Sequence, residues 1–452
     1  MLLSTNLTPA ATPPSSSRLI HIAGRTYTVG LSKVDITPTY PVRLNGYIRR
    51  NAESTNSVHP LYAKAIAFGT DRQRPAVLIC ADNCIVPKRV YDEVAARLAK
   101  RGISREKLVI LVSHSHTAPK LAGAADNIYG MDIPPADEEH IERYTRDFTD
   151  YLEKAALAAL ADRHPAKLAW SQTSASFAAN RRTKGGPVDH DVPVLIVTDL
   201  KGHLRGLLVN YACHCTTLDG KEARMCGDWA GFAQQDLEAA YPGIIALTAI
   251  GCGADQNPYP RPGLELAKQH GRELADAVNN LLFQLLTPLI PLKGKLECRA
   301  QTFALPLDTL PAREEFEKRA ADPDRTHYPA IYHAKKQLAR LNRGEKLATS
   351  IPYMVQEWNF GKDLLITFLP GEVVVDYSLR QKKEFDRSRL WVNAYVNFVP
   401  CYIPSKRVRT EGGYEGGGAM IYYDLPTRLS ESTEEIIFGN LYKIVPRSFF
   451  AH

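Results

Sequence analysis

Three apolar segments of this chain are each followed closely by residues that can bind a metal or move a proton. Histidine and glutamate side chains act both as zinc ligands and as proton-transfer groups. In α/β proteins such groups collect where buried strands end, because the loops there meet at one edge of the sheet. We therefore expect these residues to form one site. They are His114 and His116 after residues 108–112, His214 after residues 207–213, and Glu372 after residues 364–369.

Taken alone, the His114-Ser115-His116 pair leaves two interpretations open. It is either a metal or proton-transfer site, or a pair of histidines satisfied in the core or by solvent. His214 and Glu372 follow two further apolar segments and therefore favour a site. The cysteines on either side of His214 leave thiolate ligation of a metal as a minor alternative.

Two more segments have the composition of a ligand-binding site. Arg181 follows a predicted strand and could hold an oxyanion or a carboxylate, although a surface arginine would show the same pattern. Residues 412–418 contain five glycines, which permit unusual backbone angles and the close approach of a ligand. The alternative for this segment is a mobile surface loop.

The composition excludes several classes of protein. With 452 residues, of which 44% are hydrophobic, the chain can bury a large core. Its net charge of +7 comes from lysines and arginines scattered among 49 acids, so we expect no nucleic-acid partner. No apolar stretch reaches the length of about 20 residues that spans a bilayer, so we expect no integral membrane segment. The expected partner is a small-molecule substrate.

The N-terminal residues and the cysteines both favour a cytoplasmic protein. Residues 1–17 are rich in Ser, Thr and Pro and lack the basic segment and apolar core of a secretion signal. They predict a disordered leader. The eight cysteines form no CxxC pair and lie mostly in apolar segments, which favours reduced, buried thiols.

Apolar segments of strand length alternate with longer helical patterns, which predicts an α/β fold of layered mixed sheets with flanking helices. No repeat or linker interrupts the pattern, so we expect a disordered leader over residues 1–24 and a single domain over residues 25–452. Strands are expected at residues 76–80, 108–112, 167–171, 192–197, 206–213, 244–250, 296–305, 363–369 and 390–398. Helices are expected at residues 88–101, 138–161, 228–240 and 265–286, with a polar helical cover at 312–344.

The segments that carry chemistry resemble the neutral/alkaline (non-lysosomal) ceramidases, in the same order and with similar separations from about residue 26 to 425. The loop from His114 to Pro119 is similar to the family's His-Thr-His-Ser-Gly-Pro. Tyr402 and Tyr414 keep the family's spacing of twelve residues, and the second opens the same Tyr-Glu-Gly motif. The other matches are Asn180-Arg181 to Asn-Arg-Ser-Pro, His214-Cys215-Thr216-Thr217 to His-Gly-Thr-Ser, Gly227-Asp228 with Gly231 to Ser-Asp-Asn-x-Gly, and Pro370-Gly371-Glu372 to Pro-Gly-Glu.

The resemblance implies the ceramidase catalytic-domain fold and a metal centre with assigned roles. His116 would support the ligands or shuttle a proton, and Arg181 and Tyr414 would stabilise an oxyanion. The reaction implied is the attack of a metal-bound hydroxide on an N-acyl amide. A tyrosine ligand would have to be ionised, which the charge of a cation favours. The resemblance implies that one zinc ion per chain is bound by His114, His214, Glu372 and Tyr402.

The chain departs from the family where the substrate is expected. The family's Gly-Asp-Val-Ser-Pro-Asn segment carries a serine that contacts the substrate, and residues 253–258 of this chain contain none. Asp255, Gln256 and Asn257 lie there instead, and unpaired polar groups beside an acyl-chain tunnel would cost on the order of a few kcal/mol. We therefore expect these three residues to contact a substrate more polar than ceramide. The chain ends at His452, so we expect no immunoglobulin-like C-terminal domain.

Three functions are consistent with these observations. The first is a zinc-dependent hydrolase that cleaves an N-acyl amide of a polar substrate. The second keeps the metal but cleaves a glycosidic or ester bond in a sugar-like molecule. The third is a non-catalytic scaffold that has kept the fold, which the joint presence of six polar site residues disfavours.

Overall fold

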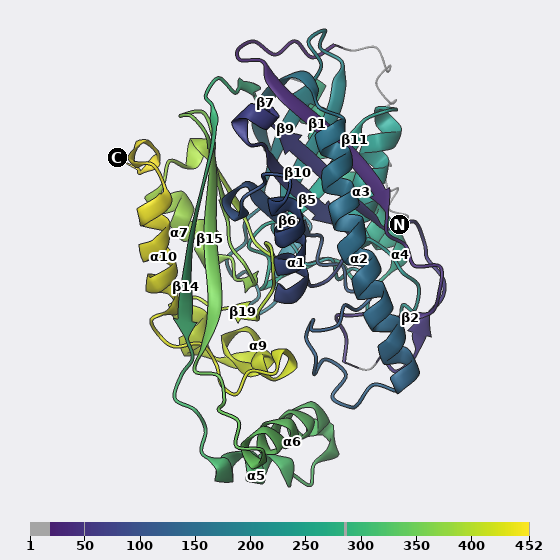
Figure 1. Ribbon diagram of the computed structural model, residues 1–452, viewed down its shortest axis with the longest axis vertical. Helices are drawn as coiled ribbons and strands as arrows, with labels where there is room; N and C mark the ends of the chain where they lie inside the picture. The colour runs from purple at the N-terminus through teal and green to yellow at the C-terminus, as the bar shows by residue number, and fades with distance from the viewer. Residues whose placement is uncertain (1–18, 49, 284–286, 452) are drawn as a thin grey trace, which may run out of the picture.

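Two mixed β-sheets lie face to face at the centre of the computed structural model, which describes residues 19–48, 50–283 and 287–451 (Figure 1). The nine-stranded sheet has the order β11 (Ile245–Ile250), β10 (Leu204–Tyr211), β9 (Asp191–Thr198), β7 (His164–Ser174), β1 (Tyr27–Asp35), β4 (Tyr62–Phe68), β5 (Ala76–Ala81) and β6 (Leu108–Val112), with β13 (Ile290–Pro291) paired to β7. The four-stranded sheet has the order β14 (Leu296–Pro306), β15 (Ser350–Phe360), β16 (Leu365–Phe368) and β18 (Leu390–Asn393).

Successive side chains of each strand enter different cores. In β5, Val77 and Ile79 join the core beneath the helices, whereas Leu78 and Cys80 join the core between the two sheets. Trp358 of the four-stranded sheet lies in the same core between the sheets. Because both faces of the sheet are covered, a strand such as β6 is buried and apolar along its whole length.

Helices cover the outer faces of both sheets, so the molecule has four layers (Figure 1). The nine-stranded sheet is covered by α1 (Lys88–Ala99), α2 (Pro135–Ala161), α3 (Asp228–Ala240) and α4 (Leu264–Phe283). The four-stranded sheet is covered by α7 (Asp376–Glu384) and α10 (Thr433–Ile444). The layered α/β fold predicted from the sequence is therefore confirmed.

Most predicted elements lie where the sequence placed them, and β6 and α3 have the predicted bounds. β18 is shorter than the predicted strand at 390–398, because Tyr395 and Asn397 have left-handed backbone angles that end an extended segment. The helix predicted at 265–286 extends to Phe283 in the structure, and its last three predicted residues, 284–286, lie outside the described residues. Residues 1–18 of the expected leader also lie outside the described residues. The division into a leader and one domain stays a prediction.

Short elements at the lower end of Figure 1 hold the functional loops next to one another. Three strand pairs lie outside the large sheets: β2 (Val42–Arg43) with β3 (Glu53–Ser54), β8 (Ala178–Asn180) with β12 (Gln256–Pro258), and β17 (Glu372–Val373) with β19 (Tyr402–Ile403). The C-terminal part adds α8 (Lys406–Glu411), α9 (Gly413–Gly416) and the 3-10 helix η5 (Gly418–Tyr423). The remaining 3-10 helices are η1 (Asp71–Gln73), η2 (Arg105–Lys107), η3 (Arg325–His327), η4 (Arg387–Arg389) and η6 (Arg447–Phe449).

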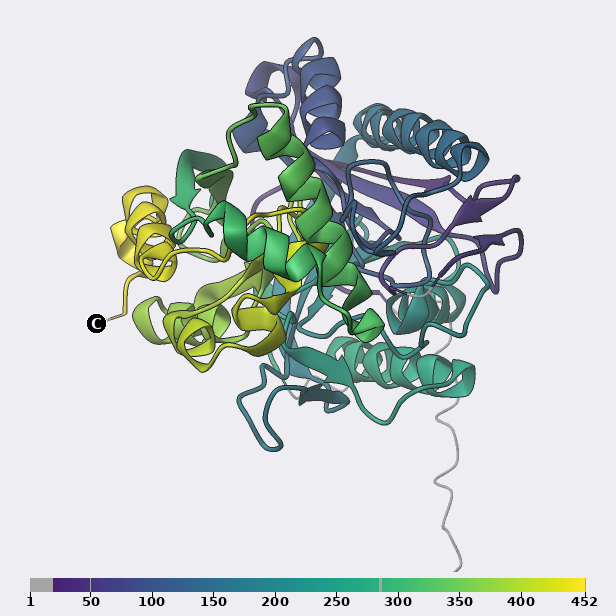
Figure 2. The ribbon, with the colours of Figure 1, turned by 90° about the horizontal axis from the view of Figure 1, so that it is seen from below.

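The polar segment between β14 and β15 forms two helices, α5 (Arg313–Ala320) and α6 (Tyr328–Asn342). Seen from below, these green helices cross the middle of the lower end of the molecule (Figure 2). The Tyr328 ring lies against Gly130, where a Cβ atom would come within 2.7 Å of it. His333 is buried, and its Nε2 lies 3.0 Å from the carbonyl oxygen of Leu425. α6 is therefore docked on the loops below the sheets.

The His333 imidazole should make the protein less stable in mild acid. Burial lowers the pKa of His333 to about 4, so the folded protein keeps this ring neutral. An unfolded chain protonates the ring near pH 6.5, so stability is full above that pH and falls as the pH drops towards 4, by about 2–3 kcal/mol. We expect His333→Gln to remove this part of the pH dependence when unfolding is measured with urea at pH 7 and pH 4.5. The matched variant His327→Gln, at an exposed histidine, should retain it, and an unchanged slope in both would contradict the assignment.

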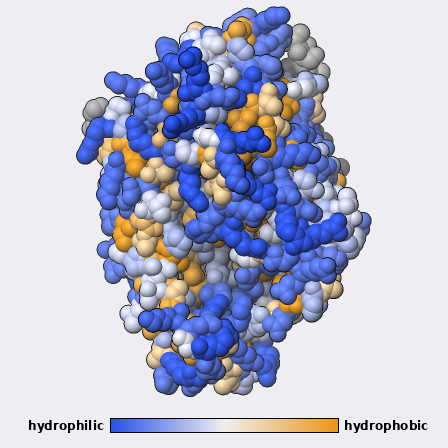
Figure 3. Space-filling model, viewed as in Figure 1, coloured by the Kyte–Doolittle hydropathy of each residue, from blue (hydrophilic) through white to orange (hydrophobic). Residues whose placement is uncertain are grey.

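The face of the molecule seen in Figure 3 is largely hydrophilic, with small separate hydrophobic areas. No helix among the described residues combines the length and the apolar character that crossing a membrane requires.

Candidate metal centre

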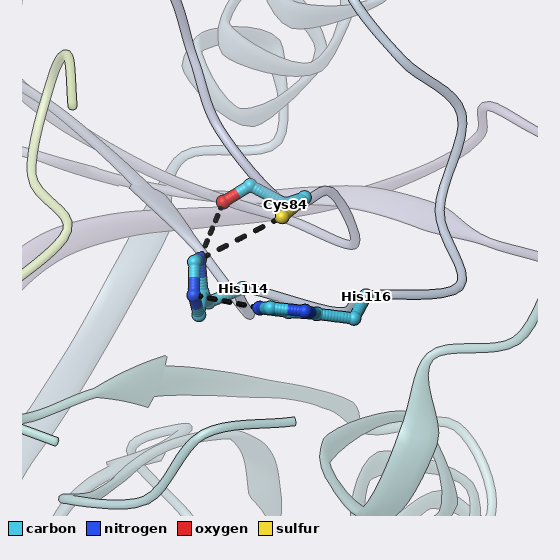
Figure 4. A group of neighbouring side chains, drawn as sticks. All are labelled: Cys84, His114 and His116. Atoms are coloured by element: carbon cyan, nitrogen blue, oxygen red, sulfur yellow. Dashed lines mark hydrogen bonds between the residues drawn. The ribbon is translucent and has the colours of Figure 1, made fainter. Parts of the chain in front are cut away.

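His114 reaches the site from the end of β6, and its backbone conformation aims the ring. Its φ of 53° is in the left-handed region, which few non-glycine residues adopt. The ring Nδ1 lies 2.8 Å from the carbonyl oxygen of Cys84, and the opposite nitrogen points away from Cys84 (Figure 4). Because Nδ1 donates its proton to that carbonyl, Nε2 is left with a free lone pair. His114 therefore presents the nitrogen of a metal ligand.

His214 is held in the same way at the end of β10. Its Nδ1 lies 2.7 Å from the carbonyl oxygen of Gly253, and its main-chain N–H donates to the carbonyl of Gln256. The ring is fully buried. An isolated parallel bridge between Ser115 and Cys215 keeps the loops of the two histidines side by side. Two imidazoles therefore face one point with their Nε2 atoms.

Glu372 comes from the other half of the molecule and completes the group. A tight turn at Gly371 (φ 90°) precedes it, where a Cβ atom would lie 2.7 Å from Ile403. Glu372 Oε2 lies 3.2 Å from Nε2 of His114 and 3.2 Å from Nε2 of His214. This oxygen is buried and has no hydrogen-bond partner among the described residues. An orphaned carboxylate oxygen between two imidazole nitrogens fits a divalent cation, because the cation can bind all three atoms at once.

The charges of this group also favour a cation. Burial opposes ionisation of Glu372, but His114 and His214 outweigh it and hold the pKa of Glu372 well below its usual range. Burial lowers the pKa of His114, yet the Glu372 carboxylate raises it overall to about 10. Burial and Arg181 lower the pKa of His214 to about 4. The carboxylate thus requires one positive charge beside it, and a metal would take the place of the proton on His114.

His116 lies beside the group rather than within it. His114, His214 and Glu372 offer ligand atoms within 4.8 Å of one another, whereas His116 groups only with Cys84 and His114. Its Nε2 is 3.0 Å from Nε2 of His114. Burial and the neighbouring imidazoles hold the pKa of His116 well below its usual range, so it is a neutral base. The roles of His114 as the ligand and of His116 as a proton carrier stay predictions.

The His116 ring occupies a space that only glycine leaves open. A Cβ atom on Gly46, whose φ is 89°, would lie 2.4 Å from Cγ of His116. The ring also packs edge-on against Tyr47, with centroids 5.0 Å apart. These contacts fix the direction of the His116 ring towards His114.

Arg181 and Tyr402 lie next to the three-residue group. The Arg181 guanidinium donates to the Tyr402 hydroxyl at 3.0 Å, to Glu415 at 2.7 Å, and lies 3.4 Å from Nε2 of His214. Tyr402 is the strand partner of Glu372 in the β17–β19 pair. Burial and then Glu372 raise the pKa of Tyr402 well above its usual range. Ligation by an ionised Tyr402 would therefore depend on the charge of the metal, and its ligand role stays a prediction.

Tyr414 lies at the solvent side of the site. It is 44% exposed, its ring centroid is 5.3 Å from that of Tyr402, and the Arg181 guanidinium lies 5.7 Å from its ring centre. The next residue, Glu415, is buried and pairs with both Arg181 and Arg182. The glycine-rich segment is thus largely helical, as α9 and η5, and places one tyrosine at the edge of the site.

The three residues predicted to contact substrate divide into two kinds. Asp255 is fully buried and accepts hydrogen bonds from the main-chain N–H of Val375 and from Asn180. Gln256 is also fully buried, and its amide donates to the carbonyl of Pro187. Only Asn257 is partly exposed, with its Oδ1 3.4 Å from Arg181. Asp255 and Gln256 therefore hold the loops in place, whereas Asn257 faces the site, and a substrate contact stays a prediction.

Two aromatic residues beside the group escaped the sequence analysis. The Tyr395 ring lies 4.3 Å from that of His114, centroid to centroid. The Tyr423 hydroxyl donates a short hydrogen bond to Oε1 of Glu372. The only signal for Tyr423 was its place five residues after the end of the glycine-rich segment. The cysteines agree with the sequence interpretation: all eight are free thiols, seven are buried, and neither Cys213 nor Cys215 joins a potential ligand group among the described residues.

Comparisons with known proteins bear on the family and on the overall fold. Residues 27–246 match the family model "Neutral/alkaline non-lysosomal ceramidase, N-terminal". The crystal structure of neutral ceramidase from Pseudomonas aeruginosa superposes with a TM-score of 0.70 at 17% identity, over 94% of this chain and 76% of that one. A ceramidase complexed with C2 gives a TM-score of 0.68 at 15% identity, over 91% and 73% of the two chains. No curated protein sequence matches the chain.

At these identities the two solved structures show a shared fold. The motifs from His114 to Gly231 fall inside the matched residues, whereas Glu372, Tyr402 and Tyr414 lie beyond them. In the structure, Glu372 nevertheless lies 3.2 Å from both His114 and His214. Over residues 27–246 the match to the family model confirms the resemblance to the neutral/alkaline non-lysosomal ceramidases that the motifs predicted.

Proposed function

We propose that this protein is a zinc-dependent hydrolase that cleaves an N-acyl amide bond. The observation that carries the proposal is the buried Oε2 of Glu372, which lies 3.2 Å from two imidazole nitrogens and has no hydrogen-bond partner among the described residues. His114, His214 and Glu372 would hold the metal, with Tyr402 as the fourth ligand. The family match supports amide hydrolysis over other uses of such a centre.

The surrounding residues have the chemistry that amide cleavage requires. A zinc ion held there supplies Lewis acidity to the scissile carbonyl and lowers the pKa of water. His116 is neutral and faces the centre with Nε2, so it can accept a proton and return it to the leaving amine. The Arg181 guanidinium, fixed by Glu415 and Tyr402, stabilises the negative charge that develops on the carbonyl oxygen. Tyr414, whose ring lies beside Tyr402 and Arg181, would donate its hydroxyl to the same oxygen.

The substrate that we propose is more polar than ceramide. Asn257 and Thr216 share a hydrogen bond of 3.2 Å beside Arg181, and residues 253–258 carry no serine. Tyr414 and the half-buried Tyr422, whose ring centroids are 6.0 Å apart, add two phenol groups at the edge of the site. Such groups bind hydroxyl- or amine-bearing molecules better than a bare acyl chain, because an apolar ligand would leave them unpaired.

The test combines metal content with a matched set of substrates. Protein purified without added metal should contain about one zinc per chain by elemental analysis. It should release a primary amine from a short N-acyl amino alcohol faster than from a long-chain ceramide, and a chelator should abolish the release. Cleavage of the matching ester or of an aryl glycoside, with no amide cleaved, would contradict amide specificity. If the protein contains no metal and hydrolyses none of these substrates, the remaining function is that of a non-catalytic scaffold.

A further inference from the structure

We propose that Tyr423 is a positioning residue for Glu372, and that α6 holds Tyr423 in place through Asp424. The inference deepens the proposed function and rests on it, because it concerns the same metal centre. It gives a role in that centre to residues that are not metal ligands. Some of them lie on α6, which is inserted between β14 and β15 of the four-stranded sheet.

The two oxygens of the Glu372 carboxylate have different surroundings. Oε2 faces His114 and His214 and has no hydrogen-bond partner among the described residues. Oε1 accepts a short hydrogen bond from the Tyr423 hydroxyl. The phenol is the donor in this bond, because an ionised carboxylate oxygen can only accept. The Tyr423 bond thus fixes the rotation of the carboxylate and leaves Oε2 for the metal.

Asp424 anchors the end of η5, directly after Tyr423. Its backbone is left-handed, with a φ of 59°, which ends the 3-10 helix and turns the chain. Its carboxylate accepts from Asn127 at 3.0 Å and from Gln337 at 2.8 Å, and it forms a short ion pair with Arg340. Gln337 and Arg340 both lie on α6, so that helix supplies two of the three donors.

A second contact ties the same segment to the loop before α2. The Asn127 side chain donates to the carbonyl of Ile421 at 3.0 Å, and its main-chain N–H donates to the carbonyl of Tyr422. Lys336 of α6 donates to Oδ1 of Asn127 at 2.9 Å. η5 is therefore clamped between the Asn127 loop and α6, with the Tyr423 hydroxyl pointing at Glu372.

Carboxylate ligands depend on such partners for their orientation. Loss of a hydrogen bond that orients a metal ligand typically lowers metal affinity by about 10- to 100-fold. A residue that does not bond to the ligand itself, but holds its hydrogen-bond partner in place, has a smaller effect. Its loss is expected to lower metal affinity by about three- to tenfold. We therefore expect graded losses of metal affinity from Tyr423 to Arg340.

The first experiment compares Tyr423→Phe with Tyr422→Phe. Zinc affinity is measured by competition with a chelating dye, and the absorption spectrum of the cobalt-substituted protein reports the ligand geometry. Tyr423→Phe should lower zinc affinity about 10- to 100-fold and change the cobalt spectrum, with an unchanged circular dichroism spectrum. Tyr422→Phe should match the wild type in both measurements. Equal affinity and spectra for Tyr423→Phe and wild type would overturn the inference.

The second experiment compares two arginines at the end of α6. Arg340 pairs with Asp424, whereas Arg343 pairs with Glu345 on the exposed side. Arg340→Ala should lower zinc affinity about three- to tenfold, and Arg343→Ala should leave it unchanged. If Arg340→Ala does not fold, Asp424→Asn removes the same ion pair and keeps a residue that tolerates the left-handed backbone. If the folded variant, Arg340→Ala or Asp424→Asn, binds zinc as tightly as the wild type, α6 does not hold Tyr423 in place for metal binding.

The two proposals fail differently. Wild-type protein that binds no zinc would overturn the proposed function and this inference together. Zinc that is bound by the wild type, lost in His214→Ala and retained in full by Tyr423→Phe would overturn the inference alone.

Discussion

Replacing His214 by alanine should abolish zinc binding and hydrolysis while leaving a folded protein. The substitution removes one of three converging ligand atoms, which we expect to lower zinc affinity by about 10³-fold or more. It also leaves the Gly253 carbonyl without its imidazole partner, at a cost of about 1–3 kcal/mol. The fold should survive, because the indole of Trp229 donates to the main-chain carbonyl of residue 214, which the variant retains.

His270→Ala is the matched control for this prediction. His270 is equally buried, stacks on Phe177 at 4.7 Å, and bonds to the Pro260 carbonyl, away from the metal ligands. Elemental analysis and amine release should show zinc and activity in His270→Ala and neither in His214→Ala. Full zinc occupancy in folded His214→Ala would remove His214 from the ligand set.

Arg181→Lys should lower kcat by about 10²-fold with little change in KM, the scale of one lost oxyanion donor. The guanidinium bonds in three directions at once, to Glu415, to Tyr402 and towards Asn257. A lysine ammonium is a single point charge and cannot reproduce that planar fork. The expected loss therefore lies in the chemical step rather than in substrate binding.

Arg182→Lys separates this effect from the loss of a guanidinium beside Glu415. Arg182 pairs with the other oxygen of Glu415 but has no bond to Tyr402 or His214 among the contacts of the described residues. Steady-state kinetics should show a kcat close to wild type for Arg182→Lys. Equal losses in both variants, or a loss confined to KM in Arg181→Lys, would contradict the oxyanion role.

Strands buried on both faces were predictable because their apolar character is continuous. β6 is the clearest case, since all five of its residues are buried. β4 and β15 were missed because charged or polar residues interrupt them. Lys64 is buried in β4 and pairs with Glu238 of α3, and Glu357 is buried in β15 and pairs with Arg299. Local sequence cannot reveal such partners, because they lie on distant elements.

The residues of the candidate metal centre were predictable for a different reason. His114, His214 and Glu372 each follow a strand, so the position of the residue in the chain already places it at one end of a sheet. Sequence position does not predict in which direction a side chain points. Asp255 and Gln256 lie beside the site in sequence, yet their side chains turn to the main chain of neighbouring loops. The Tyr423 contact depends on how η5 docks, which α6 and the Asn127 loop decide.

The metal centre draws its residues from both sheets, and this has a consequence for how the chain folds. His114 and His214 follow strands of the nine-stranded sheet, whereas Glu372 and Tyr402 follow β16 and β18 of the four-stranded sheet. A ribosome-bound chain that has released only the first sheet holds both histidines but lacks the carboxylate. The centre can therefore assemble only after the second sheet is made and docked. Under the proposed function, uptake of the cation would be one of the last events of maturation, and a bound zinc would mark a chain whose two halves have come together.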